Sequence, residues 1–517
     1  MLRSRPFQLA VPWVIALASC VALAPDGSGV EDRRELAARL FAEHCAACHG
    51  PAGEADGRVA ASLFPPPRRF SDGRLRLTSA RDGRPVREDI AATLRRGMPG
   101  SAMPSWEWLG DEAVEALAGH VLELVELGAE RRFEVEALAA GEALDLEGAR
   151  ERATHLVHAG PRFAAPARVT PNAGVLARGK TLYRENCARC HGENGRGLGL
   201  EPRWNEDGSL NWPRDFTAGA LKGGASFEAL ATRIACGMPG SAMPSFELPQ
   251  ADLAALATYT ASLIPQASEE RLVQRSGELV ARRSDGKLPT NGLDERWKDA
   301  QELEVTLAPI AWRDDAVFSV RVAALHDGRE LALRLRWSDP TRDDSLSVER
   351  EEPRLDGAAV ALSNEAAPPL AGMGAEQHPI NLWHWRARSA VDLLGVLDLV
   401  ESAPHLLRDP LAEAARADVA PLYLPAPGGA LSGGNAAELE GTGAGATEQR
   451  EGDLRTVACH TGSEWNVVFV RALASDDGRA VELAREPLVV AFAIWDAARG
   501  DHGAVKSFSI WQRVVLR

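Results

Sequence analysis

The chain has little methionine, no excess of positive charge and no long apolar run. Its 58 lysine and arginine residues face 73 acidic ones, and the resulting net charge of −15 argues against a nucleic-acid partner. The apolar run near the N-terminus, Leu9 to Leu17, is too short for a membrane-spanning helix. Only six methionines occur, and four of them lie in one repeated phrase, which is not the distribution of a flexible core residue. The length of 517 residues suits about three domains.

The repeated phrase is Gly-Met-Pro-Gly-Ser-Ala-Met-Pro-Ser, at Gly97–Ser105 and again at Gly237–Ser245. A Cys-x-x-Cys-His motif precedes each copy, at Cys45–His49 and Cys187–His191. From the first cysteine to the last methionine the distance is 58 residues in one copy and 56 in the other. The chain therefore contains the same unit twice.

Cys-x-x-Cys-His is the motif of c-type haem attachment. Two thiols on one helical turn can add to the two vinyl groups of a porphyrin, and the histidine then reaches the iron. A zinc site would need a second cysteine pair, and a redox dithiol does not require the histidine. The sequence therefore predicts two covalent haems c, attached at Cys45, Cys48, Cys187 and Cys190, with His49 and His191 as axial ligands.

The sixth iron ligand of such haems is commonly a methionine, which raises the reduction potential. We expect Met103 and Met243 in this role, because each precedes Pro-Ser-aromatic and so resembles the ligand loop of small class I cytochromes c. Met98 and Met238 are the alternatives, and are otherwise expected to pack nearby.

The N-terminus is typical of an exported protein. Arg3 and Arg5 precede the apolar run, so residues 1–24 are interpreted as a signal peptide. Leu-Ala-Ser-Cys resembles a bacterial lipoprotein box, with Cys20 as the lipidated first mature residue; the alternative is ordinary cleavage after Ala24. Either reading predicts a periplasmic or otherwise exported protein, and the first predicts a lipid anchor.

Residues 31–128 and 174–268 are predicted to form two small all-α cytochrome c domains. Helical spacing precedes each haem motif and follows each methionine phrase, for example at 111–127 with an apolar stripe. Residues 129–173 are charged and alanine-rich, then proline-rich, and are expected to form a helical spacer and a linker.

Three loop arginines and two further cysteines lie outside the haem motifs and methionine phrases. Arg68, Arg69 and Arg214 lie in loops expected to surround the porphyrins; pairing with haem propionates is one interpretation and a solvated surface position is the preferred one. Cys236 and Cys459 are expected to be buried free thiols, and Cys459 lacks the upstream cysteine of a third haem motif.

In residues 290–517 the apolar period changes to two. Leu331, Leu333 and Leu335 alternate with polar or small residues, as in a strand with one buried face, and residues 326–329 give a hairpin-turn signal before them. The expected fold is an all-β sandwich. Further strands are expected at 467–470, 488–495 and 507–515, and the Gly/Ala-rich stretch 425–446 is expected to be a mobile loop.

Four separated segments of this region resemble one family, the haem b γ subunit of ethylbenzene dehydrogenase, dimethylsulfide dehydrogenase, selenate reductase and chlorate reductase. They are 331–340 (LALRLRWSDP), 380–387 (INLWHWRA), 465–471 (WNVVFVR) and 492–511 (FAIWD, then KSFSIW). The resemblance covers most of residues 295–517. It implies one noncovalent haem b between a methionine and a lysine, and Met373 and Lys506 match those positions. It also implies a periplasmic molybdopterin/iron–sulfur enzyme as partner, although the fused cytochromes depart from the family pattern.

A lysine amine can bind iron only when it is neutral, so its pKa must fall; burial and the metal both lower it. His378 and His384 are competing ligands that need no such shift. The structural alternative is that Met373 is a core residue and Lys506 a surface amine.

The sequence thus predicts a multidomain three-haem electron-transfer protein that catalyses nothing else. A second hypothesis is a dihaem c enzyme, peroxidase-like or thiol-oxidising, in which one iron opens a coordination position. In a third, the sandwich is a haem-free docking module for the two cytochromes.

Overall fold

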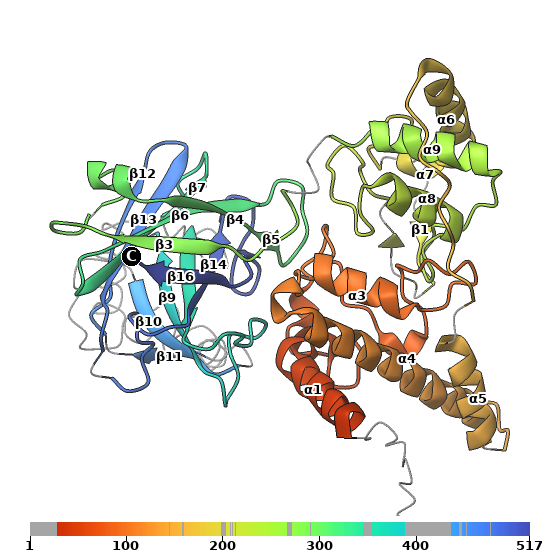
Figure 1. The fold of residues 1–517 in the computed structure, drawn as a ribbon, viewed down its shortest axis with the longest axis horizontal. Coiled ribbons are helices and arrows are strands. Elements are labelled where there is room, and N and C mark those ends of the chain that lie inside the picture. The colour runs from red at the N-terminus through yellow and green to blue at the C-terminus, as the bar shows by residue number, and fades with distance from the viewer. Residues whose placement is uncertain are drawn as a thin grey trace, which may run out of the picture.

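The computed structural model confirms the predicted fold class: a helical N-terminal region with two modules is followed by a large β domain (Figure 1). It describes residues 28–517 except 144, 158–159, 198–202, 207, 209, 212, 266–270, 290, 345–353, 388–435, 444–446, 451 and 476. The proposed signal peptide and Cys20 lie outside the described residues. None of the described helices is both long enough and apolar enough to cross a membrane.

The first module is built on two packed helices, one before the haem motif and one after the methionine phrase. Phe41 on the first contacts the His120 ring on the second, with centroids 5.1 Å apart. The predicted apolar stripe of the second helix, including Leu117 and Val125, is buried. The helices are α1 (Ser28–His44), α2 (Ala46–His49), α3 (Arg87–Arg96) and α4 (Asp111–Ala139).

The expected spacer is partly an extension of this module. Helix α4 continues twelve residues beyond 127, the end of its predicted range, to Ala139. Helix α5 (Leu146–Val157) then folds back against α4 and buries Ala149 and Ala153. The small alanine side chains allow the two helices to approach closely, so this segment adds a helical pair to the first module.

The second module repeats the plan. Gly179 lets its first helix cross its last, because a Cβ there would lie 2.3 Å from the Ala255 carbonyl oxygen. Asn172 caps the first helix by accepting a hydrogen bond from the Val175 amide at 3.0 Å. The elements are α6 (Ala173–Asn186), α7 (Ala188–His191), β1 (Arg203–Trp204), β2 (Leu210–Asn211), α8 (Phe227–Cys236) and α9 (Gln250–Ser262).

The C-terminal domain is a 14-stranded sheet folded into a nearly closed, barrel-like sandwich. Its strands run in the order β11-β10-β9-β8-β14-β16-β3-β6-β7-β13-β12, with β4, β5 and β15 attached at the side. Trp337, Trp383, Phe469 and Phe492 are completely buried between the two halves. The strands are β3 (Glu278–Arg283), β4 (Glu302–Thr306), β5 (Ala308–Pro309), β6 (Ser319–His326), β7 (Glu330–Ser338), β8 (Gly357–Ser363), β9 (Ile380–Arg386), β10 (Ala436–Gly441), β11 (Thr447–Arg450), β12 (Arg455–His460), β13 (Glu464–Ala472), β14 (Leu488–Trp495), β15 (Ser507–Phe508) and β16 (Gln512–Leu516).

Several strand predictions are confirmed. The hairpin turn lies between β6 and β7, β13 contains residues 467–470, and β14 matches residues 488–495. The stretch 507–515 is divided into β15 and β16. Strand β3 lies before residue 290, where the sandwich was expected to begin, and pairs in parallel with both β16 and β6.

The expectation of a loop across 425–446 is wrong for its second half. Residues 436–441 form β10, which pairs with β9 and β11. A buried ion pair explains why a stretch with two glutamates belongs to the sheet: Glu438 meets the Arg471 guanidinium at 3.0 Å. The first part of the expected loop, 425–435, lies outside the described residues.

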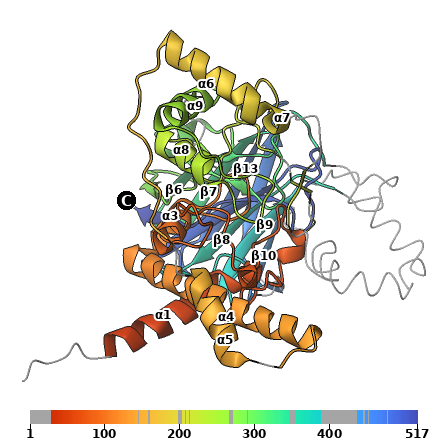
Figure 2. The same ribbon diagram turned by 90° about the vertical axis from the view of Figure 1, so that its right-hand side faces the viewer.

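The three parts lie against one another. In Figures 1 and 2 the second module lies above the first, and the helices cover one side of the sheet domain. The first module joins the sandwich through main-chain hydrogen bonds. The Phe64 amide donates to the Ile310 carbonyl at 3.2 Å, and the Trp312 amide donates to the Phe64 carbonyl at 2.7 Å.

Candidate functional site

The first haem motif forms the turn at Cys45 and helix α2. His49 Nδ1 lies 3.2 Å from the Arg68 carbonyl oxygen, and its ring stacks on Phe70 with centroids 4.9 Å apart. A carbonyl acceptor at Nδ1 holds the proton on that nitrogen and leaves Nε2 as the metal-binding atom. Burial lowers the pKa of His49, which also favours the neutral ligand form.

The second motif has the same geometry. His191 Nδ1 lies 3.2 Å from the Arg214 carbonyl oxygen, and its ring stacks on Phe216 at 4.6 Å. Burial again lowers the histidine pKa. The two modules therefore present their histidines to a ligand in the same way.

The motif cysteines are unlike those of a redox dithiol. Burial, followed by the charge of the neighbouring cysteine, raises the pKa of Cys45 and of Cys187 to about 12. Burial raises the pKa of Cys48 to about 11. Reactive dithiols have lowered pKa values. Among the described residues neither pair belongs to a cluster of potential metal ligands. Haem attachment at these cysteines stays the prediction of the Cys-x-x-Cys-His motif.

Each methionine phrase folds into a tight loop. The Met98 amide donates to the Met103 carbonyl at 3.0 Å, and Met238 donates to Met243 at 3.1 Å. Met103 packs against the hydrophobic core of the first module. The loop begins at a glycine with positive φ, Gly97 in the first copy, where a Cβ would lie 2.7 Å from the main chain of Pro104 and Ser105. The choice between the two methionines of each loop stays a prediction.

Met373 has a strained backbone. Its φ is +61°, and Gly372 and Gly374 beside it have φ of +87° and +85°. Left-handed conformations cost free energy in residues with a side chain and concentrate at functional sites. The Met373 carbonyl accepts a hydrogen bond from the Gly443 amide at 3.1 Å, which helps to fix the turn. Its side chain packs against an apolar cluster on one face of the sheet, formed by Ile380, Leu382, Leu439, Val489, Ala491 and Trp511.

Lys506 is not a solvated surface amine. Its Nζ lies 5.2 Å from the centroid of the Trp495 ring. Burial lowers the pKa of Lys506 to about 8, although the negative charge of Asp501 opposes the change. A neutral amine is therefore accessible near physiological pH, as the predicted iron ligand requires.

The two competing histidines, His384 and His378, differ in their surroundings. His384 contacts the same Trp495 ring, with centroids 5.3 Å apart, and burial lowers its pKa to about 3, so it is neutral. His378 Nδ1 instead lies 2.8 Å from the Glu365 carboxylate. Lys506 and His384 both lie at the Trp495 ring, whereas Met373 packs in the neighbouring apolar cluster. The haem b ligand pair therefore remains a prediction, with His384 as the competitor of Lys506.

Sequence reasoning missed His44, which directly precedes the first motif. It is 1% exposed, and neither ring nitrogen has a hydrogen-bond partner among the described residues. Its ring lies 5.6 Å from those of Trp106 and Trp108, and burial lowers its pKa to about 4. Trp108 also contacts the apolar cluster that Met373 joins. No periodicity or motif marks His44, because its ring partners Trp106 and Trp108 lie far along the chain and reach it only when the module folds.

The preferred reading of Arg68 and Arg214 as solvated is wrong. Arg214 donates to the Gly100 carbonyl at 2.6 Å, across to the methionine loop of the first module. Arg68 donates to the Pro239 carbonyl, in the corresponding loop of the second module, at 3.4 Å. Burial lowers the pKa of Arg214 to about 10. Arg69 is exposed, as expected.

Three family models match separate parts of the chain. Residues 33–121 match the cytochrome c oxidase cbb3-type subunit III model, and residues 176–263 match the cytochrome c model. Residues 294–398 match the ethylbenzene dehydrogenase model. The three matches fall on the two helical modules and on the sandwich.

Among similar proteins, a respiratory nitrate reductase heme subunit of Haloferax mediterranei is 24% identical over 230 residues, which are 43% of this chain and 67% of that protein. Dimethylsulfide dehydrogenase subunit gamma of Rhodovulum sulfidophilum is 31% identical over 34% of this chain and 52% of its own length. Chlorate reductase subunit gamma of Ideonella dechloratans is 25% identical over 42% and 75%. The chain thus joins two cytochrome c domains to a β domain that matches the ethylbenzene dehydrogenase model, and it is similar to the gamma subunits of dimethylsulfide dehydrogenase and chlorate reductase.

Proposed function

We propose that the protein is an exported haem subunit of a respiratory oxidoreductase, in which one haem b and two haems c relay single electrons. Bound haem supplies reversible one-electron chemistry. The partner is a redox enzyme of the molybdopterin/iron–sulfur type, by analogy with the family that the sandwich resembles. Cys20, when lipidated, would attach the complex to a membrane.

In this proposal the chain holds each iron with two side chains. His49 and Met103 serve the first haem c, and His191 and Met243 serve the second. Lys506 in its neutral form and Met373 hold haem b. The hydrogen bond from each histidine Nδ1 to a carbonyl fixes the ring and leaves Nε2 for the metal.

One observation supports the proposal: main-chain and side-chain contacts of the β domain link segments that lie next to the three candidate haem sites. The Ile310 amide donates to the Lys506 carbonyl at 2.8 Å, and the Ile310 carbonyl accepts from the Phe64 amide of the first module. Phe64 accepts in turn from Trp312, whose ring lies 5.7 Å from the Arg214 guanidinium of the second module. A relay needs its centres held close to one another, and these contacts hold the segments that would carry them.

The test is a pyridine haemochrome spectrum of the purified protein, followed by extraction with acid acetone. The expected result is two covalent haems for each extractable haem. Two covalent haems with nothing extractable would contradict the haem b assignment and favour the docking-module hypothesis. A high-spin ferric haem c at neutral pH would instead favour the dihaem enzyme.

A further inference from the structure

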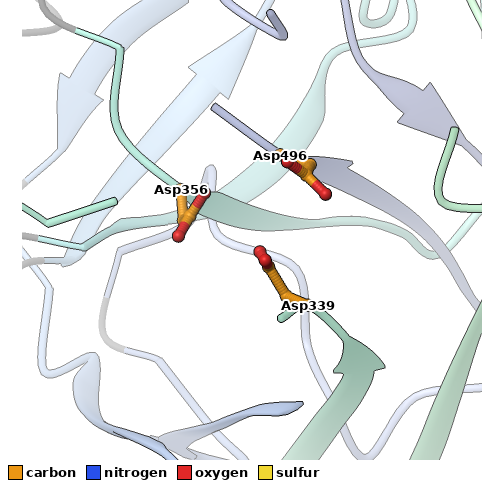
Figure 3. A group of neighbouring side chains, drawn as sticks. All are labelled: Asp339, Asp356 and Asp496. Atoms are coloured by element: carbon orange, nitrogen blue, oxygen red, sulfur yellow. The ribbon is translucent and has the colours of Figure 1, made fainter. Parts of the chain in front are cut away.

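Three aspartates from three strand ends meet inside the sandwich. Asp339 follows β7, Asp356 precedes β8 and Asp496 follows β14. Figure 3 shows their side chains directed toward one another, and one carboxylate oxygen of each lies within 4.8 Å of the others. Their exposed fractions are 0%, 0% and 1%. Three buried carboxylates at this separation repel one another strongly unless something neutralises them.

Both oxygens of the Asp356 carboxylate accept hydrogen bonds from the protein. Asp356 Oδ2 accepts hydrogen bonds from Trp465 Nε1 at 3.0 Å and from the Asp343 amide at 2.8 Å. Asp356 Oδ1 accepts from the Ala497 amide at 3.0 Å. Donors placed on both oxygens fix the orientation of this side chain, so the cluster is held in place by the surrounding fold.

Asp339 is satisfied on one side only. Its Oδ1 accepts from the Thr341 amide and hydroxyl, both at 2.9 Å. Its Oδ2 is buried and has no donor among the described residues. Buried polar atoms normally have a hydrogen-bond partner, but this carboxylate oxygen has two other carboxylates beside it instead. This orphaned oxygen is a separate indication that something positively charged binds there.

The protein's own counter-charge is incomplete. Arg499 contacts Asp496 Oδ2 at 3.1 Å and supplies one positive charge. The three carboxylates and this guanidinium sum to a charge of −2, which one divalent cation would balance. Arg313 and Asp501 also lie near Asp496, but they pair with each other at 2.6 Å and cancel. The alternative is that the cluster holds protons: burial, and then the charge of Asp339, raises the pKa of Asp356 to about 7 and that of Asp496 to about 6.

We propose that Asp339, Asp356 and Asp496 bind one calcium ion that ties the ends of β7, β8 and β14 together. The donor set is oxygen only, which selects a hard cation over zinc or copper. Calcium accepts irregular sets of carboxylate and carbonyl oxygens, whereas magnesium demands octahedral geometry and keeps several waters. A buried cluster of three carboxylates suits calcium better.

The position gives the ion a structural role. Gly357 and Trp495 are paired across β8 and β14, so Asp356 and Asp496 extend from the same end of that pair. Asp339 comes from β7, which lies in the other half of the sheet. A bound ion would therefore connect the two halves of the sandwich at one end, independently of whether haem is present.

The test is calcium binding by the full chain after EDTA treatment, measured by isothermal titration calorimetry. One ion is expected per chain, with a dissociation constant between about 10⁻⁶ and 10⁻³ M and weaker binding of magnesium. Asp339→Asn should weaken calcium binding at least about tenfold. Asp285→Asn, a change of the same kind at an exposed position, should leave binding unchanged. Absence of calcium binding below millimolar concentration, or unchanged binding by Asp339→Asn, would overturn the proposal.

Thermal melting separates a cation site from a proton-sharing cluster. In EDTA, Asp339→Asn removes one of three repelling charges and should raise the melting temperature above that of the unaltered chain. In excess calcium it removes a ligand and should lower it. If the substitution raises the melting temperature equally in both solutions, the cluster holds protons and the calcium proposal is wrong.

Discussion

The guanidinium of Arg214 donates to the carbonyl of Gly100 at 2.6 Å, although the two residues belong to different cytochrome modules. The backbone carbonyl of the same arginine accepts from the haem-motif histidine His191. Arg68 and His49 repeat the arrangement in the opposite direction, with Pro239 as the acceptor. Each arginine thus links the histidine side of one candidate haem site with the methionine loop of the other.

This reciprocity predicts that Arg214→Ala will weaken the association of the two modules. Loss of a charge-assisted hydrogen bond at a partly buried position should cost about 1.5–3 kcal/mol of stability. Denaturant unfolding followed by the haem c Soret band would measure it. Arg69→Ala, at the arginine that stays exposed, is the matched control and should change stability little. Equal effects of the two substitutions would argue against a specific link.

Substitution of the proposed haem b ligands should affect the extractable haem alone. Met373→Ala and Lys506→Ala are each expected to lower haem b content or shift its absorption spectrum, while both haems c remain. The pyridine haemochrome assay reports the two types separately. Lys287→Ala, at an exposed lysine of the same domain, should leave all haems in place. Full retention of an unaltered haem b in the Lys506 variant would exclude that residue as ligand.

The pH dependence of haem b binding distinguishes Lys506 from His384. The pKa of Lys506 is about 8, so below pH 8 protonation competes with the metal, and affinity for haem b should rise about tenfold per pH unit toward pH 8. The pKa of His384 is about 3, so a histidine-ligated haem would bind with constant affinity from pH 5 to 8. Titration of haem-b-depleted protein with haemin at several pH values would measure how the affinity for haem b changes with pH.

The same lysine predicts a pH effect on the haem-free sandwich. An unfolded lysine keeps its proton up to pH 10.5, whereas the folded one loses it near pH 8. Between these values the unfolded chain binds more protons, so folding stability should rise with pH. Comparison with Lys506→Met isolates this contribution from other titrating groups, and parallel stability curves for the two proteins would contradict it.

Gly179 offers a test of the helix crossing in the second module. Gly179→Ala would place a Cβ 2.3 Å from the Ala255 carbonyl and force α6 away from α9, with a loss of roughly 1–3 kcal/mol. Gly174→Ala lies in the same helix, where the nearest atom would be 3.4 Å away. That change should be neutral or should stabilise by about 0.5–1 kcal/mol. The melting temperature should therefore fall in the Gly179 variant and stay unchanged or rise in the Gly174 variant.

The sequence predicted what depends on local pattern. The two modules were predicted from the Cys-x-x-Cys-His motifs and the repeated methionine phrase. The sandwich was predicted from the period-two run around Leu333. Each of these is a local chemical or periodic signal. The sequence did not predict the strand at 436–441, since glycine and alanine around that strand conceal it and its burial depends on Arg471, a distant residue in β13.

The positions of Arg214, His44 and Asp339 could not be predicted for the same reason. Each acquires its environment from a partner far away in the sequence. Arg214 bonds to Gly100 in the other module, and His44 contacts Trp108. Asp339 meets Asp356 and Asp496, which follow it by 17 and 157 residues. Propensity and spacing report neighbours along the chain, whereas these contacts arise only when separate elements pack.

The main-chain ladder from Lys506 through Ile310 to Phe64 also bears on how the protein matures. The Lys506 carbonyl pairs with Ile310 inside the β domain, and the loop of the first module that contains Phe64 adds hydrogen bonds to Ile310 and Trp312. That loop follows the Cys45–His49 motif directly, and covalent attachment at the motif would order it. Haem attachment at Cys45 and Cys48 should therefore favour docking of the first module on the β domain.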